Sequence, residues 1–164
     1  MLTELQNYLQ RLEDLRGQIK NLITTVTPEQ LNLRPLQTDP EQTNTLAVLV
    51  AHVCGAEHFW ISEILGGTPP TRDRAAEFST HATSQNELFQ LLQQTSEETR
   101  AVLSALSLEE LELSRLVEDK EVPVRWALLH VVDHTALHLG HMQMTYQLLT
   151  GSTVQAPLWA QRIP

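Results

Sequence analysis

The segment WALLHVVDHTALHLGHMQM, residues 126–144, gives the strongest indication of the fold. It has a helical period and holds four of the seven histidines within twelve residues: His130, His134, His138 and His141. At about 100° per residue in an α-helix, these four lie within about 80° of one another. The same face continues through Ala127, Met144 and Leu148, so we expect it to point into the protein. A buried imidazole needs a hydrogen-bond partner or a metal, and a buried metal site is therefore the first hypothesis.

Three further segments have the same helical period, over about 3–25, 44–65 and 84–106, and the histidine-rich segment extends to about 149. No stretch has the alternation that is typical of a strand. Amphipathic helices of similar length bury their apolar faces most simply in an all-α four-helix bundle, here with longer crossover connections. At 164 residues we expect one domain, 1–164.

Capping and breaking residues predict where these helices begin and end. Capping boxes are expected at Thr27–Gln30 and at Ser84–Glu87. Gly66 and Gly151 are expected to follow the ends of the second and last long helices. A proline, Pro123, stands where the last helix could begin.

The composition is that of an ordinary globular protein, with 41% hydrophobic and 19% charged residues. The formal net charge of −9 disfavours nucleic acid and anionic lipid as partners. The single cysteine, Cys54, excludes an intramolecular disulfide and suits a reducing compartment. The sequence shows no apolar signal segment and no run of roughly 18–20 uninterrupted apolar residues, so we expect a cytoplasmic protein without a membrane span.

Helical spacing indicates which histidines could share a metal ion. Side chains four residues apart are neighbours on a helix, so His134 and His138 can bind one ion. The third ligand must come from another helix, and His52 on the inward side of the second long helix is the natural candidate. Three imidazoles with an open position are typical of catalytic zinc, and nickel or iron would accept them too. We expect His130 and His141 to line the cavity or to carry protons, and the alternative is a set of hydrogen-bonded core histidines.

Other candidate residues carry weaker signals. Cys54 lies roughly 200° around the helix from His52, so we expect it to pack in the core or to lie on the outer face. His58 and His81 are expected to be ordinary surface or capping residues. The aromatic side chains Phe59, Trp60 and Trp126 are expected in the core. The segment His134–His138 lacks the glutamate of the HExxH motif, which argues against a zinc peptidase.

These residues resemble the DinB-like (DinB/YfiT) superfamily of bacterial four-helix-bundle metalloproteins. The resemblance rests on Leu31-Asn-Leu-Arg34-Pro35 after the first helix, on Ala51-His52-Val-Cys-Gly-Ala-Glu57, and on the His-x3-His-x3-His spacing of His130–His138. It implies that His52, His134 and His138 are the metal ligands. Leu139 and His141 replace the arginine and glutamine of the family pattern, so a cation expected near the site is missing.

The resemblance implies transfer or isomerisation reactions that use low-molecular-weight thiols such as mycothiol or bacillithiol. The leading hypothesis is therefore a metal-dependent S-transferase acting on small electrophiles, with His141 or His130 as proton carrier. One alternative is a non-catalytic bundle that binds a metal or a small ligand. Another is a metal-dependent hydrolase, for which Glu63 is the available carboxylate base. The resemblance also implies a homodimer.

Overall fold

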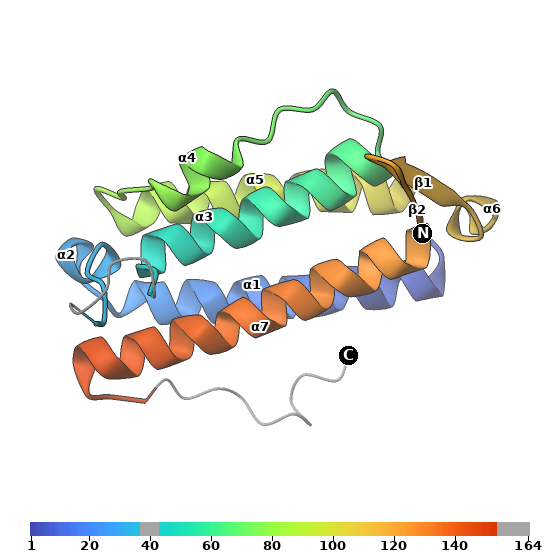
Figure 1. Ribbon diagram of the computed structural model, residues 1–164. Coiled ribbons are helices and arrows are strands. Elements are labelled where there is room, and N and C mark those ends of the chain that lie inside the picture. Colours follow the sequence, from blue (N-terminus) through green and yellow to red (C-terminus); the bar gives the residue numbers. More distant parts are fainter. Residues whose placement is uncertain (37–42, 154–164) are drawn as a thin grey trace.

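A computed structural model, which describes residues 1–36 and 43–153, shows a four-helix bundle (Figure 1). Its long helices are α1 (Thr3–Thr24), α3 (Leu46–Glu57), α5 (Gln85–Ala105) and α7 (Val124–Thr150). A π-helix, η1 (His58–Leu65), continues α3 without a break. The predicted all-α fold is confirmed. The single domain over 1–164 stays a prediction, since it includes residues outside the described ranges.

The helices form a square in which α1 and α3 lie on a diagonal. Each of these two packs against both α5 and α7. Figure 1 shows that α3 and α5 run in one direction, and that α1 and α7 run in the other. Because α3 and α5 are parallel, the chain from 66 to 84 returns along the length of the bundle, which confirms the expected long crossover.

The second long helix is a core element of the bundle. Every residue of α3 except Gly55 is buried. Over Leu46–Leu65 the mean hydropathy of 1.3 is high enough for a membrane span by length and composition, although the run is interrupted by polar residues. Within the bundle, however, 72% of this window is buried, as in the core helix of a soluble protein.

Three short helices, α2 (Pro28–Leu31), α4 (Arg74–Phe78) and α6 (Leu108–Leu111), cover the connections. The predicted capping box at Thr27 and Gln30 is present, and Ser107 forms another with Glu110. The box predicted at Ser84 is wrong. Its glutamate, Glu87, accepts hydrogen bonds from the backbone and side chain of Thr83, the residue before Ser84.

A β-hairpin between α6 and α7 was not predicted from the sequence. The strands β1 (Ser114–Val117) and β2 (Lys120–Pro123) pair antiparallel, and Val117 lies opposite Lys120. Each strand has four residues, and neither has a buried residue, so the hydrophobic alternation that reveals a strand is weak. The turn places Glu118 at φ 56°, where a glycine or asparagine would have signalled it.

A buried ion pair joins α1 to α3 inside the bundle. The guanidinium of Arg16 donates to the carboxylate of Glu57, and both side chains are at most 6% exposed. The hydroxyl of Thr99 on α5 donates to the same carboxylate at 2.5 Å. Burial raises the pKa of Glu57, while Arg16 and Thr99 oppose that shift. Inside the bundle, contacts with Arg16 and Thr99 therefore replace the water that would hydrate the Glu57 carboxylate.

Removing Arg16 should destabilise the bundle strongly. We expect Arg16→Ala to cost about 3–5 kcal/mol in the free energy of unfolding, because a buried carboxylate loses its counter-charge. Urea denaturation measures this cost. The matched control is Arg11→Ala, which removes a pair with Asp14 that is 40% exposed on the arginine side and should change stability by about 0.5 kcal/mol or less. Equal effects of the two substitutions would contradict the assignment.

Candidate metal centre

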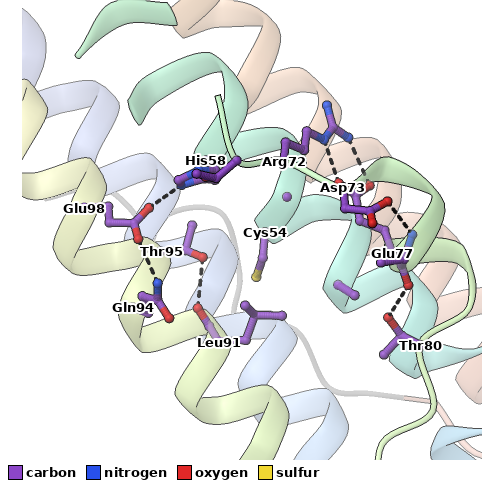
Figure 2. Close-up of a pocket in the computed structure, with 14 residues that line it drawn as sticks. Cys54, His58, Arg72, Asp73, Glu77, Thr80, Leu91, Gln94, Thr95 and Glu98 are labelled. Carbon is purple, nitrogen blue, oxygen red and sulfur yellow. Dashed lines mark hydrogen bonds and ion pairs between the residues drawn. The ribbon is translucent and has the colours of Figure 1, made fainter. Parts of the chain in front are cut away.

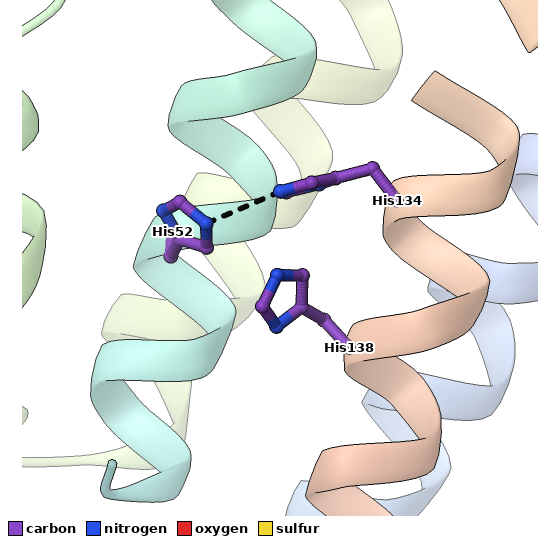
Figure 3. Close-up of side chains that lie close together, drawn as sticks. All are labelled: His52, His134 and His138. Atoms are coloured by element: carbon purple, nitrogen blue, oxygen red, sulfur yellow. Dashed lines mark hydrogen bonds between the residues drawn. The ribbon is translucent and has the colours of Figure 1, made fainter. Parts of the chain in front are cut away.

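Helices α3 and α7 bring three histidines together on facing sides. His52 comes from α3, and His134 and His138 come from successive turns of α7 (Figure 3). One nitrogen atom of each ring lies within 4.8 Å of the corresponding atoms of the other two. The Nε2 atoms of His52 and His134 are 3.2 Å apart. The structure thus places the three predicted residues in a single cluster.

The donor set fits a divalent metal. Two nitrogens bound to a tetrahedral zinc at about 2.0–2.1 Å are separated by roughly 3.3–3.4 Å. The 3.2 Å between the Nε2 atoms of His52 and His134 is close to that separation. Three imidazoles without a fourth protein ligand are typical of an open zinc site, and nickel or iron also accepts imidazole.

The α7 histidines are held neutral, as a metal ligand must be. Burial, followed by positive charge on His138 and His52, lowers the pKa of His134 to about 3. Burial and His52 lower the pKa of His138 to about 4. At neutral pH both rings therefore keep a free lone pair that a metal could use.

A carboxylate that was not predicted from the sequence contacts the cluster at His52, on the ring nitrogen that faces away from His134. Glu77 of α4 places Oε2 2.8 Å from Nδ1 of His52 and is itself 7% exposed. Arg72 pairs with the same carboxylate through Nε at 2.6 Å and Nη2 at 3.0 Å. Glu77 lies 25 residues from His52 on the crossover segment, so no local spacing could have linked them.

The predicted inward direction of the histidine face is wrong in part. The buried stripe of α7 includes Val131, Thr135, Leu139 and Met142, centred roughly 100° around the helix from the histidines. His134 and His138 are consequently half-buried on the flank that faces α3. Beyond them the face is open to solvent: His141 is exposed, and Met144 and Leu148 are each 57% exposed.

The two remaining histidines of α7 lie on either side of the cluster. His141 places Nδ1 3.3 Å from Nδ1 of His138 and is exposed to solvent. His130 lies one turn before His134, with ring centroids 5.8 Å apart. It stacks on Trp126 at 4.8 Å and 6°, and the edge of Trp60 approaches it at 5.3 Å. Both residues are thus near the cluster, in different surroundings.

Aromatic rings lie against His52 and His130, and some are more exposed than the sequence suggested. Phe78 of α4 lies 5.0 Å from the ring of His52. Trp126, predicted to be in the core, is 49% exposed, because its position on α7 lies opposite the buried stripe. Trp60 is half-buried on η1, and π-helical segments of this kind are frequent at functional sites.

Other residues singled out by the sequence have different surroundings. Cys54 is buried in the core as one of the two predictions had it, and burial raises the pKa of its thiol to about 12. His81 is exposed as expected. His58 is not an ordinary surface residue, since it contacts Glu98 at 2.6 Å and the hydroxyl of Thr71 at 2.9 Å.

The remaining charged candidates are engaged as well. The carboxylate of Glu63 accepts the backbone N–H groups of Thr71 at 2.5 Å and Arg72 at 2.8 Å, so it holds the crossover and not the histidine cluster. Leu139, where the family pattern has arginine, is buried in the core. Arg72 instead brings a cation close enough to lower the pKa of His134.

Comparison with known proteins places this arrangement in a family. Residues 5–151 match the family described as mycothiol-S-transferase, which is DinB/YfiT-like, so the resemblance seen in the sequence is confirmed. A crystal structure of a conserved protein from Enterococcus faecalis is similar in fold, with a TM-score of 0.74 and 15% identity. The match covers 93% of this chain and 100% of that one. No curated protein matches significantly.

The lowered pKa values of His134 and His138 predict a loss of stability in acid. Between about pH 6.5 and pH 4 the unfolded chain takes up protons at these residues that the folded, metal-free chain does not. Stability should therefore fall as the pH falls through this window. Urea denaturation of the chelator-treated protein at pH 7 and pH 5 measures the change, and a His134→Gln/His138→Gln variant should lose less. Parallel losses in the two proteins would contradict the assignment.

Proposed function

The chain belongs to the mycothiol-S-transferase family, and on that basis we propose that it transfers a low-molecular-weight thiol to a small electrophile at a metal centre. The observation that carries the proposal is the cluster of His52, His134 and His138 within a chain whose residues 5–151 match the family. We propose these three histidines as the metal ligands. The metal is zinc in the first instance, with nickel or iron as alternatives.

The reaction needs a thiolate and an acceptor for the thiol proton. When bound, the metal would lower the pKa of the thiol, and the thiolate is the reactive nucleophile. The sulfur forms a bond to an electrophilic carbon of the second substrate, whose leaving group departs with its electron pair. His141 is well placed to pass the released proton to water, because it is exposed and adjacent to His138.

His130 is better suited to shaping the site than to carrying protons. Its ring is packed flat against Trp126 and edge-on to Trp60. Together these rings form an aromatic wall on one side of the histidine cluster. The guanidinium of Arg72 is already paired with Glu77. An apolar or flat electrophile suits such a site better than a carboxylate does.

One observation favours a second function, a metal-binding bundle without catalysis. His141 lies beside His138 and offers a fourth imidazole, which could close the coordination shell. No similar observation supports a hydrolase, because Glu63, its proposed base, is engaged by the crossover backbone. A closed shell would leave no position for a thiol.

We also propose that the protein acts in the cytoplasm as a homodimer. Reduced thiols are characteristic of the cytoplasm, and Cys54 is a free thiol. The outer face of α7 carries an exposed apolar stripe with side chains each about half exposed: Trp126, Leu129, Leu137, Met144 and Leu148. A second copy packing on this stripe would cover it, and large exposed apolar patches commonly mark interaction sites.

Metal content and activity test the proposed function together. The purified protein should hold about one equivalent of zinc, nickel or iron, and a His134→Ala/His138→Ala variant should hold none. Removal of the metal should lower thiol transfer to a chromogenic haloarene on the order of a hundredfold or more, with recovery on reloading. Full activity without metal would refute the mechanism. A bound metal without any transferase activity would favour the metal-binding bundle.

Charged substitutions in the exposed apolar stripe of α7 should change the molecular mass of the protein in solution from that of a dimer to that of a monomer. Size-exclusion chromatography with light scattering should give twice the chain mass for the wild type. Leu137→Glu/Met144→Glu should give a folded monomer, because each new carboxylate would be buried against the partner. The control is Leu113→Glu, which charges an apolar residue that is 51% exposed outside α7. A monomeric wild type would contradict the proposal.

A further inference from the structure

We propose that Glu77 positions His52 for the metal, and that Gly55 is required because it leaves space for the Glu77 carboxylate. This inference rests on the proposed metal centre and deepens it. It assigns positioning roles to two residues that hold no metal themselves. It also gives the long crossover between α3 and α5 a part in building the site.

The first step is the orientation of the imidazole. Glu77 Oε2 lies 2.8 Å from Nδ1 of His52, and a carboxylate there accepts a hydrogen bond from Nδ1–H. The other nitrogen, Nε2, then keeps its lone pair and lies 3.2 Å from Nε2 of His134. Metal-binding histidines commonly have a carboxylate on the remote nitrogen, which fixes the ring and raises its basicity. Glu77 is in that position for His52.

The second step is the space that the carboxylate occupies. Gly55 follows His52 by three residues, so it lies about one turn along the same side of α3. A Cβ atom on Gly55 would lie 2.1 Å from Oε1 and 2.6 Å from Cδ of Glu77. Both distances are far below van der Waals contact. Any larger residue at position 55 would therefore force the Glu77 carboxylate to shift, and we expect this shift to weaken its contact with His52.

The third step is the anchoring of Glu77 from its other side. Arg72 pairs with both carboxylate oxygens, and Figure 2 shows Arg72 and Glu77 together on one side of the pocket. The backbone of Arg72 is held in turn by Glu63, and Asp73 caps the helix that carries Glu77. These contacts fix the crossover segment on both sides of Arg72, and they hold the Glu77 carboxylate next to His52.

A second histidine–carboxylate pair in the same region provides a matched control. His58 and Glu98 form a contact of 2.6 Å along another wall of that pocket (Figure 2). His58 is not in the histidine cluster. Removal of the Glu98 charge should therefore leave metal binding unchanged. For the glycine, the control is Gly17 of α1, where an added Cβ would meet nothing within 4 Å.

The experiment measures zinc affinity by competition with a chromogenic chelator. The proteins compared are the full-length wild type, Glu77→Gln, Gly55→Ala, Glu98→Gln and Gly17→Ala. We expect Glu77→Gln and Gly55→Ala to weaken zinc binding about 10–100-fold, and the two controls to stay within about twofold of the wild type. Urea denaturation of the metal-free proteins shows whether a variant is folded. If Gly55→Ala does not fold, the isosteric Glu77→Gln decides alone.

Two results would overturn the inference, and they are distinguishable. If the wild type does not bind zinc, nickel or iron at all, the proposed metal centre is wrong and the inference falls with it. If the wild type binds zinc while Glu77→Gln and a folded Gly55→Ala bind it equally well, the centre stands. In that case Glu77 has no positioning role.

Discussion

The packing of α3 against α7 determines both the core of the bundle and the position of the histidine cluster. Because nearly all of α3 is buried, a polar side chain on it must find its partners inside the protein. His52 finds them on two sides, with Glu77 at Nδ1 and His134 at Nε2. The two histidines of α7 meet it because they lie on the flank of that helix, beside its buried stripe. The same packing that closes the core therefore assembles the three imidazoles.

Two buried carboxylates enter this core together with their partners. Glu57 is buried with Arg16 and Thr99, and Glu77 is buried with Arg72 and His52. The two carboxylates serve different elements. The first joins three long helices, whereas the second fastens the crossover segment to the histidine cluster. Mutation of the first should thus affect stability, and mutation of the second should affect what the cluster can hold.

The sequence predicted the long helices and the histidine cluster because both depend on local periodicity. A heptad-like spacing locates an apolar stripe, and a four-residue spacing locates His134 and His138. Glu77 and Gly55 could not be predicted this way, since their relation to His52 exists only once the crossover has folded back. The hairpin was not predicted for another reason: Glu118 has a positive φ at the turn, and glutamate is not a residue that indicates such a turn. The exposure of Trp126 could be predicted only with knowledge of which face of α7 is buried.

X-ray absorption spectroscopy of the metal-loaded protein is the most direct test of the three-histidine metal centre, because it counts and identifies the atoms around the metal. We expect one bound metal with three imidazole nitrogens at about 2.0–2.1 Å. A His52→Gln variant should lose one imidazole from the spectrum. A site with no imidazole, or a spectrum that is unchanged in the variant, would contradict this metal centre.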